Sequence, residues 1–391
     1  MENTGLSKTQ ITFMAISAGV CVANIYYNQP ILKDIALSLH TSESNVGLIS
    51  VLAQAGYGFG LFFITPLGDK FNRKKLILGL QILLIAALLG MVFIENRIGI
   101  FIMSLIIGVC SVAAQVILPM AASLETKNKG KTISLIFSGI LIGILAARVF
   151  SGFIADWLGW HYVYAISSVM VLVTALMIHF SLPNIKQDFT GNYTSLLQSA
   201  LQQIGRFAKL RQTALLGAIV FGAFCSFWTT LTFHLGGAPF NYGTDTIGLF
   251  GLLAIAGALG APYVGKLIDQ GNPAKAQLYT TGLLVVSILL LKIFPYDVWA
   301  IVIAVLLLDV GVQATQLINI ATIYSLDEKA NSRINTIYMT SYFIGGALGT
   351  YIGVQCWKYG GWDVVTSQLT LWSIMAFIIA VYSWKTNNKT I

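Results

Sequence analysis

Long apolar runs, each close to the length of a membrane-crossing helix, are the feature that most constrains this sequence. A helix needs roughly 20 mostly apolar residues to cross a bilayer. Only 10% of the 391 residues are charged, against about 25% in soluble domains. The sequence therefore predicts an all-α membrane protein with twelve transmembrane helices, at 9–32, 45–68, 76–94, 98–122, 132–155, 161–182, 212–235, 245–268, 277–294, 297–322, 334–355 and 364–384.

An internal repeat relates the first six runs to the last six. Asp69 after the second run has a counterpart in Asp269 after the eighth. At a fixed offset of 202, five residues at loops and helix ends recur in order, with Glu125, Lys131, Gly143, Gly159 and Trp160 matching Asp327, Arg333, Gly345, Gly361 and Trp362. Duplicated units of this kind form a shared site near the membrane midplane. We predict two pseudo-symmetric six-helix bundles, at 1–182 and 212–391.

Basic residues gather at one end of the predicted spans. With the N-terminus in the cytoplasm, most of the 23 lysines and arginines fall in cytoplasmic loops, and Arg148 alone lies deep inside a span. The positive-inside rule then predicts a bacterial plasma (inner) membrane protein with both termini cytoplasmic. We expect the net charge of +8 to face membrane lipid and not nucleic acid.

The segment 183–211 is the longest polar connection in the chain. Leu197, Leu201, Ile204 and Ala208 recur in it at helical spacing, close to Arg206. This pattern favours an amphipathic helix on the inner membrane surface. A loosely ordered linker is the alternative.

The loop after the second run, Thr65 to Lys75, carries a recognisable motif. It resembles the signature loop of the major facilitator superfamily, G-x-x-x-D-[RK]-x-G-x-[RK]-[RK], with Thr65 and Asn72 in place of the glycines. The resemblance implies a cytoplasmic gate made by charge pairs, formed here by Asp69, Lys70, Arg73, Lys74 and Asp269. Positive-inside topology alone would explain the basic residues but not the repeated aspartates.

Two further spans carry weaker family features. Gly139, Gly143, Ala147 and Ser151 make a stripe of small residues that resembles a degenerate glycine-rich motif of drug and sugar antiporters, and packing alone also accounts for it. In the fourth span, Ser104 stands where proton-coupled drug antiporters carry an arginine. These features and the segments 24–30 and 308–313 carry the resemblance to one group of the family. The chain is most similar to the arabinose-efflux-permease-like group.

Asp309 is the only acid placed near the middle of a span. A charge there costs at least about 2.5–3.5 kcal/mol, so we expect it to face a cavity or a partner and to bind substrate or take a coupling proton. A structural hydrogen-bond cluster between helices is the alternative. Gln313 and Gln316 follow on the same helix face. Arg148 lies within roughly one helical turn of Asp309 in depth. A direct pair is one possibility. The alternative is that Arg148 contacts backbone carbonyls or reaches outward along its stem.

Other polar side chains within the spans need partners in hydrocarbon. As a set they suit a polar substrate, although each is singly more typical of helix–helix contacts: Asn24, Tyr27, Asn28, Gln54, Tyr57 and Gln115.

The sequence lacks a nucleotide-binding loop, metal-ligand spacing and a nucleophile paired with a base. We therefore expect no enzyme activity, no catalytic or metal site and no cofactor beyond a proton gradient. The leading hypothesis is a monomeric secondary active transporter that exports a small polar or amphipathic molecule in exchange for protons by alternating access. The alternatives are a proton-coupled importer of a metabolite or siderophore-like compound, and a membrane sensor that transports nothing.

Overall fold

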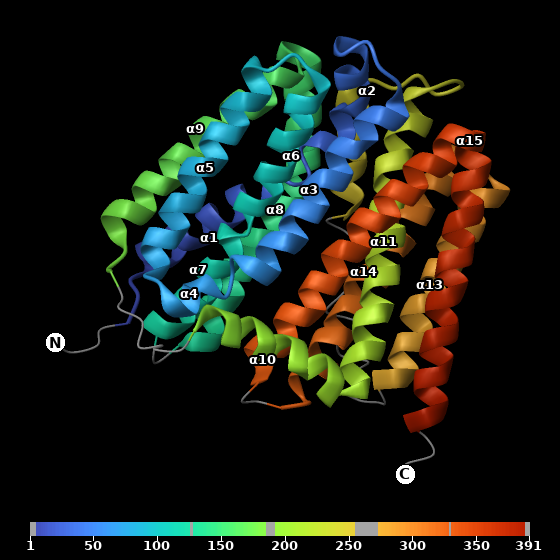
Figure 1. Cartoon of the computed structure of the whole chain (residues 1–391). Coiled ribbons are helices and arrows are strands. Elements are labelled where there is room, and N and C mark those ends of the chain that lie inside the picture. The colour runs from blue at the N-terminus through green and yellow to red at the C-terminus, as the bar shows by residue number, and fades with distance from the viewer. Residues whose placement is uncertain (1–4, 126–127, 185–191, 255–272, 328–329, 388–391) are drawn as a thin grey trace.

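The computed structural model describes residues 5–125, 128–184, 192–254, 273–327 and 330–387, and within these ranges the chain forms helices and no strands. Figure 1 shows two groups of helices side by side, joined by a helix at one end. The N-terminal group contains α1 (Lys8–Ala23), α2 (Asn28–Ser38), α3 (Glu43–Phe63), α4 (Leu67–Lys70), α5 (Arg73–Phe93), α6 (Arg97–Ser111), α7 (Ala113–Leu124), α8 (Lys129–Leu158) and α9 (Trp160–Ser181). After the joining helix α10 (Tyr193–Arg206), the C-terminal group contains α11 (Ala208–Gly236), Thr244–Ala254, α13 (Pro273–Ile293), α14 (Val298–Tyr324) and α15 (Asn331–Asn387).

The described residues include nine helices that are long and apolar enough to cross a membrane, or ten if α1 and α2 form one bent span. This count differs from the predicted twelve for two reasons. The helix Thr244–Ala254 covers only the start of the predicted eighth span, whose remainder lies outside the described residues. The predicted eleventh and twelfth spans form one element, α15, which is interrupted by non-helical backbone at Gly360 and Gly361.

Polar residues start several of the apolar helices. Ser7 and Gln10 form a capping box at the start of α1. Asn72, Asn96 and Asp297 accept hydrogen bonds from the first backbone N–H groups of α5, α6 and α14. These caps satisfy donors that the helix itself leaves free. The capping residues therefore define where these apolar helices begin.

The first predicted span is bent by 41° between α1 and α2. At the bend, the amide of Asn24 donates to the Val20 carbonyl at 2.8 Å and that of Asn28 to the Ile25 carbonyl at 2.9 Å. Such side chains compete with the helical hydrogen bonds, and Pro30 has no N–H to continue them. The bend changes the direction that side chains before and after it face.

The structure reproduces the internal repeat at two turns. Gly159 and Gly361 both have positive φ, at 98° and 59°. Each is followed by a buried tryptophan, Trp160 or Trp362. Only glycine adopts such backbone angles without strain, so the same residue is required at both positions.

The small-residue stripe of α8 packs against α1. A Cβ atom on Gly143 would lie 2.3 Å from the Gly19 carbonyl oxygen, and one on Gly139 would lie 2.5 Å from that of Ala15. The equivalent contact in the second half joins Gly345 of α15 to Ala218 of α11, at 2.3 Å. At Gly139 and Gly143 the stripe therefore permits close contact of the two helices, as the packing interpretation expects.

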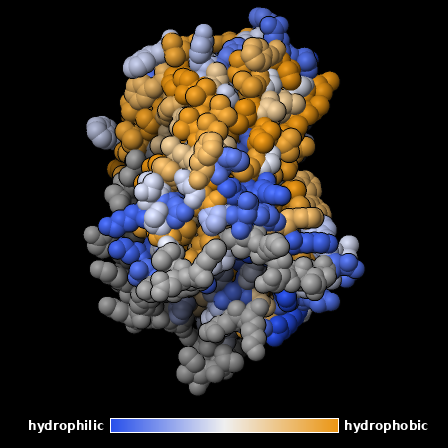
Figure 2. All heavy atoms as spheres, turned by 90° about the vertical axis from the view of Figure 1, so that its left-hand side faces the viewer, coloured by the Kyte–Doolittle hydropathy of each residue, from blue (hydrophilic) through white to orange (hydrophobic). Residues whose placement is uncertain are grey.

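Figure 2 shows an apolar surface over most of the N-terminal helices, with hydrophilic side chains gathered toward the lower end. Ile82, Phe93 and Phe180 of the N-terminal helices are exposed apolar side chains, as expected for helices that face lipid. We call the end that carries α4 and α10 the linker end, and the opposite end the distal end (Figure 1). Within the predicted linker 183–211 the chain forms α10, and Arg206 at the end of this helix binds Asp327 with an N–O distance of 2.6 Å.

Candidate transport site

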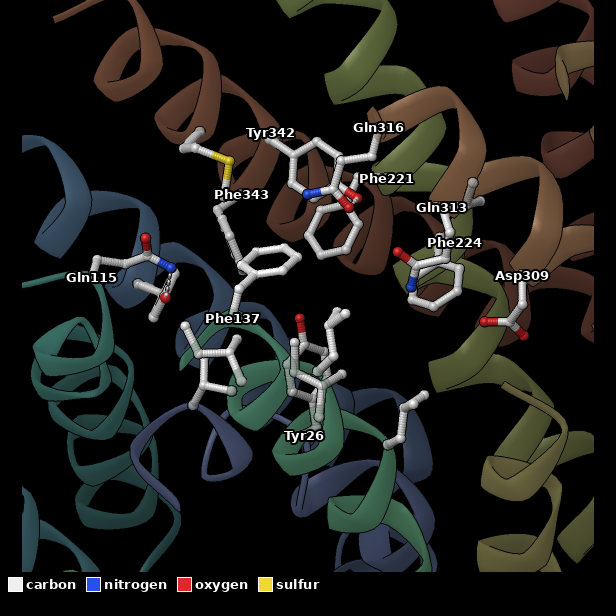
Figure 3. Close-up of a pocket in the computed structure, with 18 of the residues that line it drawn as sticks. Tyr26, Gln115, Phe137, Phe221, Phe224, Asp309, Gln313, Gln316, Tyr342 and Phe343 are labelled. Atoms are coloured by element: carbon white, nitrogen blue, oxygen red, sulfur yellow. Dashed lines mark hydrogen bonds between the residues drawn. The ribbon is translucent and has the colours of Figure 1, made fainter. Parts of the chain in front are cut away.

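A cavity lies between the two groups of helices, near the middle of the molecule. Its volume is about 70 Å³. The N-terminal group contributes residues of α1, α3, α7 and α8, and the C-terminal group residues of α11, α14 and α15. Figure 3 shows Gln115 and Asp309 on opposite sides of it, with aromatic rings between them. Its polar lining residues are Gln115, Arg148, Asp309, Gln313 and Gln316.

Arg148 of α8 is held at this cavity by several contacts and is only 1% exposed. Its Nε donates to Gln29 Oε1 at 2.7 Å. Its guanidinium carbon lies 4.2 Å from the ring centre of Trp228 and 5.4 Å from that of Tyr26, in cation–π contact with both rings. Neither Nη atom has a hydrogen-bond partner in the described part of the chain. One edge of the guanidinium is therefore fixed, while both Nη groups are unpaired.

Asp309 of α14 is fully buried. Neither of its carboxylate oxygens has a hydrogen-bond partner among the residues that the structure describes. Arg148 and Asp309 form no ion pair within those residues. Within the described part of the chain, the cavity thus has an unpaired cation on one wall and an unpaired acid on the other. The predicted direct pair and the predicted backbone contact of Arg148 are both absent from this conformation of the described residues.

The predicted polar set divides into two groups. Tyr57 and Gln115 line the cavity and are hydrogen-bonded to each other at 3.0 Å, and Gln313 and Gln316 line it from α14. The four predicted residues that do not line this cavity are all buried elsewhere: Asn24, Tyr27, Asn28 and Gln54.

Two of these four have partners inside the N-terminal group. Asn24 accepts a hydrogen bond from Ser167 at 2.7 Å, and Asn28 accepts one from Ser50. Both contacts hold neighbouring helices together. A role of these residues in binding stays a prediction.

The gate residues lie at the linker end. Arg73 pairs with Asp69 at 2.9 Å and also donates to the Pro119 carbonyl. Lys74 donates to the Leu182 carbonyl at 2.6 Å, after the end of α9, and Lys70 ends α4 half-buried. All of these partners belong to the N-terminal group. Asp269 lies outside the described residues.

Further cavities lead from the centre to the linker end. The first shares Gln115 and Met339 with the central cavity and has a volume of about 280 Å³. The second shares Thr65 and Thr336 with the first, has a volume of about 260 Å³ and reaches Asp69. This series of spaces approaches the site from the linker end.

At the distal end the two groups of helices are in close contact. Lys33 donates to the Gly236 carbonyl, and Trp357 donates to Glu43 at 2.8 Å. A Cβ atom on Gly47 would lie 2.5 Å from Val354. Beside the central site, a Cβ atom on Gly248 would lie 2.8 Å from the Arg148 carbonyl oxygen. The distal side of the cavity is closed in this conformation.

The sequence did not predict the aromatic part of the lining. Its rings come from helices far apart in the chain and have no shared spacing: Tyr26, Phe137, Phe221, Phe224, Tyr342 and Phe343. Gln29, which fixes Arg148, lies in the segment 24–30 that carried part of the family resemblance. That segment is the only signal that could have led to it.

The fold and the cavity between two groups of helices define a multi-pass helical membrane transporter. The chain belongs to the major facilitator superfamily, because the family profile with that description matches residues 14–350. "Uncharacterized transporter YgaY" of Escherichia coli O157:H7 is 38% identical over 361 residues, which are 92% of each chain. "Inner membrane transport protein YnfM" of Escherichia coli (strain K12) is 24% identical over 376 residues, 95% of this chain and 89% of the relative. A crystal structure of the nucleoside transporter NupG has the same fold, with a TM-score of 0.76 at 11% identity, over 95% of this chain and 98% of that one.

Proposed function

We propose that this chain is a monomeric secondary active transporter of the bacterial inner membrane, which exports a small polar or amphipathic molecule in exchange for protons. The single observation that carries this proposal is the placement of Arg148 and Asp309. They come from opposite groups of helices, line one cavity and have no hydrogen-bond partner for the Nη and Oδ atoms in the described structure. Unpaired buried charges are costly, which favours a site that is filled during the transport cycle.

Asp309 is the group that we propose to couple the two flows. A carboxylate takes up one proton and loses its charge. Because the side chain lies in the central cavity, the rocking of one group of helices against the other would expose it to each side in turn. Substrate and proton would then occupy Asp309 alternately.

The orientation follows from the basic residues of the loops. The positive-inside rule supports a cytoplasmic linker end, so the conformation described above faces inward. We propose that Asp69 and its neighbours close this end when the distal end opens, which fits their present contacts within one group of helices. Export as the direction is supported by the resemblance to the efflux permeases and antiporters.

The test uses everted membrane vesicles in which respiration acidifies the interior. A panel of radiolabelled sugars, amines, carboxylates and amino acids is added, and compound uptake and interior pH are recorded together. We expect at least one compound to enter while protons leave, and we expect Asp309→Asn to abolish this exchange. Asp363→Asn, which removes an acid with an 84% exposed side chain, is the matched control.

Three outcomes would revise the proposal. Compound movement without any proton movement would remove proton exchange. Full exchange by Asp309→Asn would remove that residue from coupling. A compound that leaves preloaded everted vesicles together with protons would replace export by proton-coupled import.

A further inference from the structure

The central cavity is lined by Arg148 and Asp309, which have opposite charges and do not pair with each other or with any other charged side chain that the structure describes. Arg148 is 1% exposed and Asp309 is 0% exposed, so water screens neither of them well. In the described structure, both Nη atoms of the arginine and both oxygens of the acid lack hydrogen bonds. The site therefore offers four unused polar atoms, divided between two walls.

These charges restrict the charge of a fitting ligand. A ligand with only a carboxylate would pair with Arg148 and leave Asp309 unpaired beside it. An amine would pair with Asp309 and leave Arg148 unpaired. Leaving one buried charge without a partner is strongly unfavourable, whereas a ligand with both groups satisfies both walls.

The geometry of Arg148 favours a carboxylate as the anionic group. Its Nε is occupied by Gln29, which leaves the two Nη groups as a pair of donors. A carboxylate has two acceptor oxygens that match such a pair. Asp309, with two free acceptor oxygens, suits an ammonium group with its three donors.

The remaining wall is mostly aromatic. Phe221 and Tyr342 are stacked with ring centres 3.9 Å apart, and Tyr57 and Phe343 meet at 4.3 Å. The Tyr57–Phe343 contact joins the two groups of helices. A cavity of about 70 Å³ has room for roughly two water molecules, so a ligand must separate some of these rings. A planar apolar group would replace the ring contacts that it breaks.

We propose that the substrate is a zwitterion with an aromatic side group, its carboxylate bound by Arg148 and its ammonium by Asp309. This inference rests on the proposed function and names the substrate class of the same site. This substrate class also explains why substrate and protons are exchanged. A proton on Asp309 removes the negative charge that binds the ammonium group of the substrate. Proton and substrate are then direct competitors for one carboxylate.

The test is equilibrium binding to the wild-type protein in lipid nanodiscs, measured by calorimetry without any gradient. Phenylalanine and glycylphenylalanine carry both charges and a ring at two charge separations. 3-Phenylpropionate keeps the carboxylate alone, 2-phenylethylamine the ammonium alone, and alanine both charges without the ring. We expect at least one of the two ring-bearing zwitterions to bind about tenfold or more tightly than each of the other three probes.

Two substitutions then test which residue binds which charged group of the ligand. In Asp309→Asn we expect the advantage of the zwitterion over 3-phenylpropionate to disappear. In Arg148→Gln we expect its advantage over 2-phenylethylamine to disappear. The wild-type series decides the proposal even if one of these variants fails to fold.

The proposal is overturned if a single-charge probe binds as tightly as the zwitterions, or if neither ring-bearing zwitterion binds. These results are separate from those of the vesicle assay. Proton exchange driven only by amines or sugars would leave the proposed function intact and overturn the substrate class. Tight zwitterion binding without proton movement would support the substrate class and overturn the proton exchange of the proposed function.

Discussion

Substitution of Gly152 by alanine should favour the conformation in which the distal end is open. Gly152 of α8 faces the other group of helices, and a Cβ atom there would lie 2.5 Å from the Thr244 carbonyl oxygen and 3.0 Å from the Gly248 Cα atom. Both are backbone atoms, which cannot rotate away as a side-chain tip can. Relief requires the two groups of helices to move apart.

The magnitude follows from this geometry. Overpacking by one methyl group in a tight contact costs about 1–3 kcal/mol. The cost applies only while the distal ends are together, whereas the gain in helix propensity from glycine to alanine is the same in both conformations. The ratio of distal-open to distal-closed molecules should therefore rise roughly 5- to 150-fold.

The assay is a pulsed electron resonance measurement of the distance between two spin labels at the distal end. Labels at Leu158→Cys and Tyr296→Cys, both exposed, report on opposite groups of helices after Cys356→Ser removes the partly exposed native thiol. We expect Gly152→Ala to increase the long-distance population. Gly79→Ala, whose new Cβ would meet nothing within 4 Å, is the control. An unchanged distribution, or the same change in the control, would refute the reasoning.

Two other substitutions test the gate and the packing of the small-residue stripe. Asp69→Asn should lower turnover several-fold with little change in substrate affinity or thermal stability, because a partly exposed pair with Arg73 contributes under about 1 kcal/mol to folding; turnover equal to that of the wild type would count against gating. Gly143→Ala should destabilise the protein by about 1–3 kcal/mol, because its Cβ would lie 2.3 Å from the Gly19 carbonyl oxygen. Thermal unfolding checks the second prediction against Gly130→Ala, whose Cβ would meet nothing within 4 Å, and equal melting temperatures would contradict it.

The fold followed from the sequence because lipid allows few alternatives. Apolar runs must satisfy their backbone groups internally, which makes them helices. The fixed-offset repeat matched Gly159 with Gly361, and both have positive φ. Helical spacing also predicted that Asp309, Gln313 and Gln316 share a face, and all three line the cavity.

The rest of the lining depends on which helices are neighbours, and spacing along one helix does not encode that. Asn24 and Asn28 lie at the bend between α1 and α2 and do not line the cavity. The rings of Phe221 and Tyr342 meet across two helices. Such contacts are properties of the assembled bundle.

Alternating access is tested most directly by the side of the membrane from which a reagent reaches position 313, because Gln313 lines the central cavity. Gln313→Cys, combined with Cys356→Ser, is treated in vesicles of each orientation with a membrane-impermeant thiol reagent. We predict faster labelling from the linker side than from the distal side, and faster labelling from the distal side once Gly152→Ala is added. Labelling from neither side in either protein, or equal rates from both sides that Gly152→Ala leaves unchanged, would contradict a cavity that opens alternately.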